Sequence, residues 1–303
     1  MTVLTRRQFA MLPAAVLVAQ GATTYRRAFA QPSSPLITRA IPSSGEYLPV
    51  VGLGTAQVFD SADKATLQKA SAVIQSLVGN GGKLIDTAST YGDAERVLGD
   101  VIAPAGLRNK LFIATKLESP DAAELKQSLS RLRTEKLDLL QLHNVSDPQQ
   151  SLSAFKEWKA QGVCRYIGIT STFHGAFPAV EAVLTSQKPD FVQIDYSIED
   201  REAEKRILPV AQDNKSGVLT ALPFGRGRLF RAVRGKMLPD WASEFAANWA
   251  QFFLKYLLGD PRVTAVIPGT SNPAHMTDNL GAMRGPLPDA HQRRRMVEYI
   301  EAL

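Results

Sequence analysis

Eight short runs of apolar and often β-branched residues recur along this sequence, and longer segments of helical character separate them. The runs occupy residues 49–55, 83–88, 111–116, 137–143, 166–170, 191–196, 218–223 and 263–269. Each run is apolar almost throughout, which is typical of parallel strands that are buried on both faces. Eight β units that alternate with helices predict an α/β fold with one closed barrel of the (β/α)8 type, the TIM barrel.

The segments between the runs have the periodicity of amphipathic helices. In residues 65–78 the apolar side chains share one stripe at spacings of three and four: Leu67, Ala70, Val73, Ile74 and Leu77. Further helices are predicted at residues 94–102, 122–132, 152–161, 177–184, 202–212 and 241–258. Asp121, with Glu124 three residues later, matches the capping-box pattern at the start of one of them.

The two ends of the barrel region carry extra elements. Residues 35–48 predict a β-hairpin ahead of the barrel, and residues 289–303 predict a final basic helix. No linker-like or low-complexity stretch interrupts residues 35–303, so one domain accounts for them. An open, doubly wound sheet is the alternative, although no Gly-x-Gly-x-x-Gly motif follows the first strand.

Residues 1–30 have the layout of an export signal. Arg6-Arg7 is followed by an apolar stretch at residues 11–19, and Ala28-Phe29-Ala30 offers a small-x-small cleavage site. The paired arginines predict a twin-arginine signal, which exports folded proteins, here to the periplasm. An uncleaved membrane anchor and a chance basic N-terminus are the alternatives. The apolar stretch is shorter than the roughly 20 residues of a membrane span, so we expect no stable span after cleavage.

Charge and cysteine content exclude several classes of function. The net charge is +6, but residues 1–30 contribute four arginines and no acidic residue, which leaves +2 for the remainder. A nearly neutral body without a dense basic run does not predict nucleic-acid binding. The single cysteine, Cys164, excludes an intramolecular disulfide and any zinc or iron–sulfur site that needs several thiolates, and we assign no metal ligands.

Polar residues stand where three neighbouring strands are predicted to end. The second run ends near Asp86 and leads to Tyr91, the third ends at Lys116 and the fourth at His143. In a (β/α)8 barrel the chemistry lies at the carboxyl ends of the strands, so these four side chains should meet at one mouth. Taken singly, each has an ordinary structural explanation as a helix cap, rim aromatic, surface lysine or structural histidine. Their joint placement favours a catalytic site.

The four side chains have coherent chemistry. A lysine ammonium lowers the pKa of a nearby tyrosine, and an aspartate holds the lysine in place. The tyrosine then serves as a general acid toward a carbonyl oxygen. A neutral histidine would orient that oxygen and stabilise the charge that develops on it.

The local sequences around these residues resemble the aldo-keto reductase family. The matching segments are residues 51–55, 84–88 with Tyr91-Gly92, 113–116, 137–143, 266–273 and 278–279, in the order of the family, and they span roughly residues 45–285. The resemblance implies that residues 31–303 form an aldo-keto reductase-like barrel. It also implies a catalytic tetrad of Asp86, Tyr91, Lys116 and His143, a small-molecule aldehyde or ketone as substrate, and hydride from NADPH or NADH, with Tyr91 as proton donor.

The resemblance also implies residues that bind the nicotinamide nucleotide. They are Gly54, Thr55, Thr170, Ser171, Gln193, Phe224, Gly225, Gly227, Gly269, Thr270, Ser271, His275 and Asn279. Thr170, Ser171 and Gln193 correspond to family positions that bind the carboxamide, and residues 223–228 correspond to the loop over the pyrophosphate. Taken alone, this loop is an ordinary flexible surface loop.

Two departures from the family pattern affect how the nucleotide is expected to bind. Gly269 and His275 stand where NADP-preferring members carry a lysine and an arginine, so the sequence does not decide between NADP(H) and NAD(H). The aromatic residue that stacks on nicotinamide is replaced by Ala221 or Leu222. Phe224 or Tyr196 is the candidate to take over that role, and absence of the stack is the alternative.

Two other functions fit the sequence. One is a Schiff-base lyase with Lys116 as its nucleophilic amine, which requires a lysine of depressed pKa. The other is a non-catalytic barrel that binds nicotinamide as a sensor or partner subunit, because an exported protein has little reduced cofactor around it. Substrate identity and oligomeric state are not determined by the sequence. The apolar stripe of Trp241, Phe245, Trp249, Phe252 and Phe253 is attributed to core packing.

Overall fold

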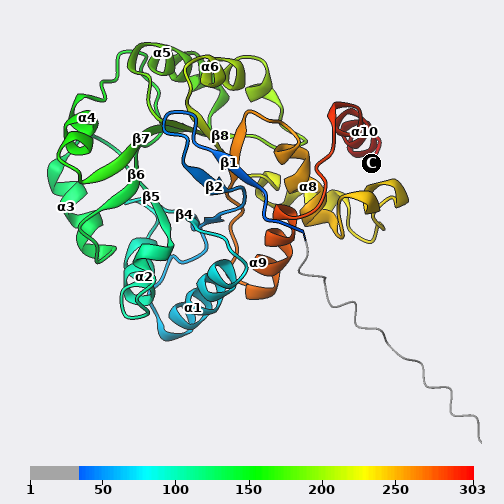
Figure 1. Cartoon of the computed structure of the whole chain (residues 1–303), viewed down its shortest axis with the longest axis horizontal. Helices are drawn as coiled ribbons and strands as arrows, with labels where there is room; N and C mark the ends of the chain where they lie inside the picture. Colours follow the sequence, from blue (N-terminus) through cyan, green and yellow to red (C-terminus); the bar gives the residue numbers. More distant parts are fainter. Residues whose placement is uncertain (1–33) are drawn as a thin grey trace, which may run out of the picture. The chain divides into compact units, whose positions relative to one another are not determined.

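A ring of eight parallel strands surrounded by helices forms the centre of the computed structural model, which describes residues 34–303 (Figure 1). The strands are β3 (Leu53–Gly54), β4 (Leu84–Asp86), β5 (Phe112–Leu117), β6 (Leu137–Leu142), β7 (Cys164–Ser171), β8 (Phe191–Asp195), β9 (Gly217–Ala221) and β10 (Val263–Val266). They pair in sequence order from β3 to β10. The ring closes through parallel bridges between Val51 and Val266 and between Gly54 and Gly269. The predicted (β/α)8 barrel is therefore confirmed, and the open sheet is excluded.

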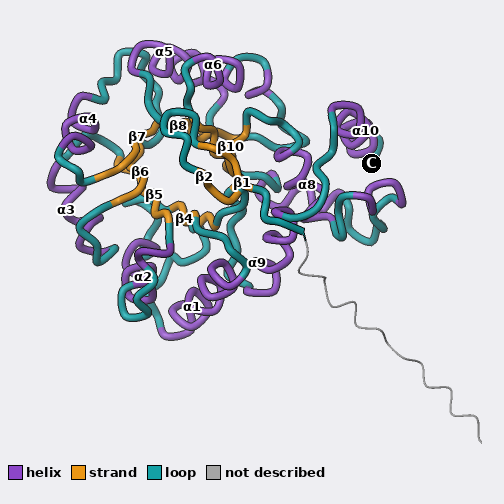
Figure 2. Tube along the Cα trace, viewed as in Figure 1, coloured by secondary structure: helices purple, strands orange, loops and turns teal. Residues whose placement is uncertain are grey.

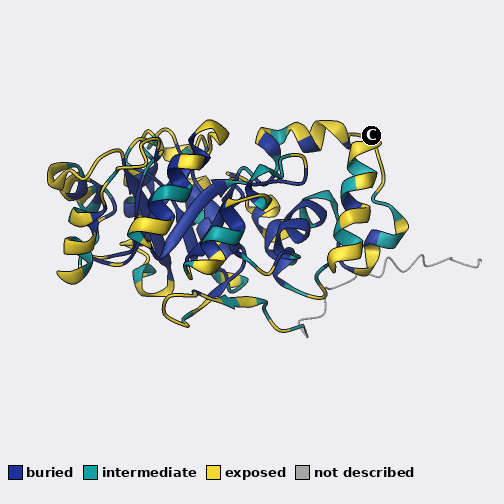
Figure 3. Ribbon diagram, turned by 90° about the horizontal axis from the view of Figure 1, so that it is seen from above, coloured by how far each residue is buried: buried dark blue, intermediate teal, exposed yellow. Residues whose placement is uncertain are grey.

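Helices lie outside the ring and cover it. They are α1 (Lys64–Gly79), α2 (Ala94–Ile102), α3 (Ala122–Arg131), α4 (Ser153–Ala160), α5 (Phe177–Gln187), α6 (Ile207–Asp213), α7 (Arg228–Ala232), α8 (Trp249–Leu258), α9 (Pro273–Leu280) and α10 (Ala290–Glu301). Figure 2 shows this alternation of strand and helix around the barrel. The strands are almost wholly buried while the helices expose their outer faces (Figure 3). Their near-continuous apolar composition follows from this double-sided burial.

Two predicted helices are each broken into two pieces. The segment predicted at 202–212 divides at Arg206 into the 3₁₀ turn η3 (Glu202–Glu204) and α6, which places Pro209 in the first turn, where a missing N–H costs nothing. The segment predicted at 241–258 divides into η5 (Asp240–Glu244) and α8. The Asn248 side chain caps α8 by accepting a hydrogen bond from the Gln251 N–H.

Of the predicted capping box at α3, the cap by Asp121 is present and the return hydrogen bond from Glu124 is not. The Asp121 carboxylate accepts from the Ala123 N–H and so caps the helix. Glu124 does not return a hydrogen bond to Asp121. Its carboxylate instead accepts from the Ser89 hydroxyl at 2.6 Å and from the Glu118 N–H at 3.2 Å. The Glu124 side chain thus ties together two loops at the mouth of the barrel.

The predicted hairpin is present and closes the end of the barrel where the strands begin. Strands β1 (Thr38–Ala40) and β2 (Tyr47–Pro49) pair antiparallel, and Figure 1 shows them crossing the ring. Ile41 and Leu48 are fully buried in one cluster with the inward-facing side chains of the barrel strands, Phe112 and Phe191 among them. The hairpin therefore supplies the floor of the barrel interior.

The aromatic stripe of residues 241–253, which runs from η5 into α8, packs inside the protein, as expected. Phe252 and Phe253 are fully buried, and Trp249 stacks on Phe253 with ring centroids 5.8 Å apart. Tyr299 of α10 contacts Trp249 with ring centroids 6.2 Å apart. The predicted final helix thus covers this stripe.

Within residues 34–303, every helix is too short or too polar to cross a membrane. The predicted export signal at residues 1–30 lies outside the described residues.

Candidate active site

Side chains that point into the barrel change from apolar to polar along the strands. On β5 the inward-facing Phe112 is followed on the same face by Lys116, and on β6 Leu139 is followed by Gln141. His143 comes directly after the end of β6 and lines the cavity. Alternate residues of a strand share a face, so the apolar layer near the hairpin and the polar layer near the opposite end arise from the same register. The polar layer lies at the carboxyl ends of the strands, where a (β/α)8 barrel carries its chemistry.

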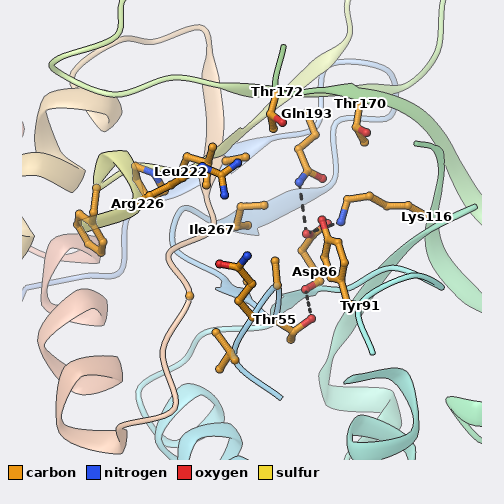
Figure 4. Close-up of a pocket in the computed structure, with 18 of the residues that line it drawn as sticks. Thr55, Asp86, Tyr91, Lys116, Thr170, Thr172, Gln193, Leu222, Arg226 and Ile267 are labelled. Carbon is orange, nitrogen blue, oxygen red and sulfur yellow. Dashed lines mark hydrogen bonds and ion pairs between the residues drawn. The ribbon is translucent and has the colours of Figure 1, made fainter. Parts of the chain in front are cut away.

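A cavity of about 760 Å³ opens at this end of the barrel. Its lining includes the whole predicted tetrad, Asp86, Tyr91, Lys116 and His143. Figure 4 shows Asp86, Tyr91 and Lys116 converging from neighbouring strands and the loop after β4. The volume is typical of a pocket for a small molecule or a cofactor.

Asp86 and Lys116 form a buried ion pair at the base of the cavity. Lys116 Nζ lies 2.7 Å from Asp86 Oδ2, and the two side chains are 1% and 3% exposed. Nζ also donates to the Thr87 carbonyl at 2.7 Å. Burial alone would lower the pKa of Lys116, but the Asp86 carboxylate and the Tyr91 phenol outweigh burial and raise it above its ordinary value. Lys116 is therefore an ammonium at neutral pH.

The Tyr91 hydroxyl points toward the Lys116 ammonium (Figure 4), and Lys116 Nζ lies 4.6 Å from the centre of the Tyr91 ring. An ammonium has only donors, and Asp86 and Thr87 occupy two of the three, which leaves one for the Tyr91 oxygen. The hydrogen of Tyr91 then stays free to be donated into the cavity.

The expected fall in the pKa of Tyr91 is wrong in direction. Burial raises the pKa of Tyr91 above its ordinary value, and Lys116 opposes this only in part because Asp86 and Glu118 add negative charge nearby. The phenol is accordingly protonated at neutral pH, which is the form a general acid needs.

His143 lies beside Tyr91 and contacts an acidic residue that the sequence analysis did not single out. The two rings meet edge to face with centroids 5.7 Å apart. His143 Nδ1 pairs with the Glu118 carboxylate. Burial and the Lys116 charge lower the pKa of His143 below its ordinary value, in spite of Glu118. The imidazole is therefore neutral at pH 7, as expected, but its Nδ1 is engaged by a carboxylate.

Two buried glutamines connect the strands behind the ion pair. Gln141 Nε2 donates to the Gln193 side-chain oxygen at 3.1 Å and lies 3.3 Å from Asp86 Oδ1. Gln193 Nε2 lies 3.3 Å from Asp86 Oδ2 (Figure 4). Gln193, predicted to contact the nicotinamide carboxamide, is thus also part of the network that holds Asp86.

The structure brings about half of the predicted nucleotide-binding residues to this cavity. Those that line it are Gly54, Thr55, Thr170, Gln193, Phe224, Gly227 and Gly269. The Thr55 hydroxyl donates to the Asp86 carbonyl at 3.0 Å, which fixes the loop after β3 against β4. The cavity thus extends from the tetrad to the loops that follow β3, β9 and β10.

The other predicted nucleotide-binding residues do not line the cavity: Ser171, Gly225, Thr270, Ser271, His275 and Asn279. Ser171 alternates with Thr170 and faces the opposite way, and its hydroxyl accepts from the Phe173 N–H at 3.3 Å. The Thr270 hydroxyl accepts from the Asn272 N–H at 3.1 Å. His275 is exposed on α9, and Asn279 is buried on the same helix.

The two aromatic residues suggested to stack on nicotinamide differ in position: Phe224 lines the cavity and Tyr196 does not. Tyr196 is fully buried away from the cavity, and its hydroxyl bonds Glu204 and accepts from Arg293 at 2.7 Å, so that suggestion is wrong. Phe224 lines the cavity and packs on Phe230 with ring centroids 4.8 Å apart. Ala221 and Leu222 also line it.

Glu118, Gln141 and Arg226 are lining or bordering residues that the sequence analysis did not assign. Glu118 lies two positions after Lys116, just past the end of β5, and Gln141 lies on β6 two positions before His143. A spacing of two from a tetrad member was therefore a signal for both. Arg226 lines the cavity and has no carboxylate partner among residues 34–303, unlike Arg228, which pairs with Glu199 at 2.8 Å.

Comparisons with known proteins agree with this geometry. The sequence profile of the Aldo/keto reductase family matches residues 50–297. Aldo-keto reductase YhdN of Bacillus subtilis is 31% identical over 233 residues, which cover 68% of this chain and 66% of that protein. Methylglyoxal reductase YeaE of Escherichia coli is 27% identical over 265 residues, covering 83% of this chain and 92% of its own.

Solved structures share the fold. An aldo-keto reductase of Klebsiella pneumoniae, crystallised in complex with NADPH, superposes with a TM-score of 0.73 at 23% identity, covering 88% of this chain and 96% of that one. The family profile spans the barrel and includes every strand that carries a tetrad residue. The chain belongs to the aldo/keto reductase family.

Proposed function

We propose that the protein reduces small aldehydes or ketones with a reduced nicotinamide nucleotide, and that Tyr91 is the proton donor. The observation that carries this proposal is the Lys116 ammonium, which Asp86 and the Thr87 carbonyl fix beside the Tyr91 hydroxyl inside the open end of the barrel. When bound, the nucleotide supplies the hydride. Tyr91 supplies the proton to the carbonyl oxygen, and the Lys116 charge stabilises the phenolate that remains.

The residues present fit such a nucleotide. Gly269 presents no side chain to the cavity, and a Cβ there would lie 3.2 Å from a Val58 methyl that also lines it. The loop after β9 has left-handed backbone at Leu222, Gly225, Arg226 and Gly227, which folds it tightly over the rim. Arg226 offers a guanidinium without a carboxylate partner among the described residues, which suits a pyrophosphate. Gln193 offers an amide for the carboxamide.

The geometry argues against a Schiff-base lyase. A nucleophilic lysine must be a neutral amine, whereas the pKa of Lys116 is raised and its donors face Asp86, Thr87 and Tyr91. Borohydride in the presence of a carbonyl substrate should therefore leave Lys116 unmodified.

The decisive experiment is titration of purified residues 31–303 with NADPH and NADH separately, followed by steady-state assays over a carbonyl panel. Methylglyoxal belongs in that panel because a relative from Escherichia coli is named as a methylglyoxal reductase. Binding with repeated turnover supports the proposal. Binding with no turnover of any carbonyl would favour the non-catalytic barrel instead.

Arg226 and Arg228 provide a matched pair for the cofactor loop. Arg226→Ala should weaken nucleotide binding by about tenfold, because a charge-assisted contact to phosphate is lost. Arg228→Ala removes a charge from the same loop but only its contact with Glu199, and it should leave binding within about twofold. Gly269 and His275 carry no permanent charge, so we expect weak discrimination between NADPH and NADH.

We further propose that residues 1–30 direct folded export to the periplasm by a twin-arginine route. The support is the sequence alone: Arg6-Arg7, the short apolar stretch and the Ala28-Phe29-Ala30 cleavage motif. Replacement of Arg6 and Arg7 by lysine should retain the protein in the cytoplasm, as judged by fractionation. The N-terminus of the exported protein should be Gln31, and an unprocessed N-terminus in the periplasm would contradict the cleavage site.

A further inference from the structure

Glu118 directly follows the last residue of β5, two positions beyond Lys116 toward the mouth of the barrel. Its carboxylate accepts from the Thr90 hydroxyl at 3.0 Å, and Thr90 is the neighbour of Tyr91 in the chain. The same oxygen pairs with His143 Nδ1. The backbone N–H of Glu118 donates to Glu124 at 3.2 Å, which anchors the residue from behind. Glu118 thus contacts the loop of the proton donor and the histidine of the tetrad at once.

This contact determines where the imidazole of His143 carries its hydrogen. A carboxylate only accepts hydrogen bonds, so the hydrogen of a neutral His143 must lie on Nδ1. Nε2 is then a bare nitrogen. His143 lines the cavity, and Nε2 has no hydrogen-bond partner within residues 34–303, so it is the nitrogen left for a bound molecule.

We propose that Glu118 is a positioning residue that holds the hydrogen of His143 on Nδ1, so that Nε2 accepts a hydrogen bond when the ring is neutral and donates one to a substrate carbonyl only when the ring is protonated. This inference rests on the proposed function, and it replaces the expectation of a neutral histidine that donates to the carbonyl oxygen. A protonated ring also brings a positive charge to the oxygen on which negative charge develops.

The charges around His143 give the direction of the pH dependence. Lys116 on β5 and burial disfavour the protonated ring, while Glu118 and Asp86 favour it, and the net effect lowers the pKa of His143 below its ordinary 6.5. Tyr91 faces the ring from the loop after β4 and keeps its proton throughout this range because its own pKa is raised. Carbonyl reduction should therefore be fastest below the pKa of His143 and fall as pH rises through it. Alcohol oxidation, which needs a neutral Nε2 to accept from the hydroxyl, should rise.

The first test measures the tautomer without any turnover. The chain has four histidines, so ¹⁵N–¹H correlation spectra of the imidazoles are simple, and His143→Gln identifies the signals of His143. Above its pKa, His143 should carry its hydrogen on Nδ1. In Glu118→Gln the amide can donate to Nδ1, and the hydrogen should move to Nε2. Glu118→Ala removes both donor and acceptor, so it checks the case in which the glutamine oxygen still accepts from Nδ1. A wild-type ring with its hydrogen on Nε2, or a tautomer that is unchanged in both variants, overturns the proposal.

The second test compares pH profiles of kcat/KM for reduction. One pH unit above the midpoint of the wild-type profile, kcat/KM of the wild type should have fallen by about tenfold. In Glu118→Gln it should have fallen by less than about twofold, because the neutral ring of this variant donates through Nε2. Glu124→Gln is the matched control: it removes a neighbouring carboxylate charge that does not touch His143, and it should keep the wild-type profile.

The two readouts separate this inference from the proposed function. Absence of turnover in the wild type refutes the carbonyl reductase, while the spectra still decide the tautomer. Turnover with identical pH profiles in the wild type, Glu118→Gln and Glu118→Ala refutes the role of Glu118 and leaves the reductase standing. Glu118 is 44% exposed, so its conversion to glutamine should leave thermal unfolding within a few degrees of the wild type.

Discussion

Asp86 holds the ammonium of Lys116 at 2.7 Å where the two side chains are almost completely enclosed by protein. Removal of only one partner of such a pair lowers the stability of the fold, because it leaves the other charge buried without compensation. Each partner is therefore needed for stability while the other is present, as well as for the proposed chemistry.

Lys116→Met should accordingly reduce the free energy of unfolding by about 3–5 kcal/mol and abolish carbonyl reduction. Urea unfolding followed by circular dichroism gives the first quantity. The double variant Asp86→Asn with Lys116→Met removes both charges and should recover a good part of the lost stability, though not the activity. Equal destabilisation in the single and double variants would show that packing, rather than charge, explains the loss.

Tyr91→Phe should reduce kcat for carbonyl reduction by about 10²–10⁴ while nucleotide binding stays within about twofold, because the ring remains and only the proton source is removed. Stopped assays give kcat, and quenching of nucleotide fluorescence gives the affinity. The edge-to-face contact with His143 is retained in this variant, so its thermal unfolding serves as the folding control. A variant as active as the parent would assign the proton donor elsewhere.

Gly54→Ala should destabilise the barrel by about 1–3 kcal/mol, because the added methyl would lie 2.7 Å from the Ile267 carbonyl at the seam where β3 meets β10. Gly79→Ala is the matched control, since nothing lies within 4 Å of a Cβ at that position of α1 and alanine suits a helix. Chemical unfolding of the two variants side by side measures the difference. Equal stabilities would mean that the seam is loose enough to accept a side chain.

Cys164 should be inert toward thiol reagents at pH 8 in the folded protein. Burial raises the pKa of its thiol to about 12, so the reactive thiolate is essentially absent until the pH approaches that value. Reaction with a disulfide reagent should be slow in buffer and rapid in denaturant. Immediate reaction of the native protein would show that the start of β7 opens readily.

The sequence predicted the barrel because its strands are buried on both faces and are correspondingly apolar. Those runs could be located to within a few residues without any knowledge of contacts. The helix breaks at Arg206 and Asn248 were missed, although a proline in one segment and a capping asparagine in the other were present as local signals.

The tetrad was predicted because strand ends converge in this architecture. The direction of the pKa shift of Tyr91 was not predicted correctly, because the burial of the phenol and its distance from the charges of Asp86 and Glu118 depend on tertiary packing. The contact between Glu118 and His143 joins residues 25 positions apart that directly follow β5 and β6, and the pairing of Leu117 with Leu142 at the ends of these strands brings them together. Resemblance alone also assigned Ser171 to the cavity, whereas strand alternation turns it away.

The hairpin that floors the barrel has a kinetic consequence. Ile41 and Leu48 close one end of the barrel, so every molecule that reaches the tetrad must enter through the open end. Whichever reactant sits deeper has to arrive first and depart last. Initial-rate patterns and product inhibition should therefore follow a compulsory order, and a random order would mean that the two reactants reach the tetrad by separate routes.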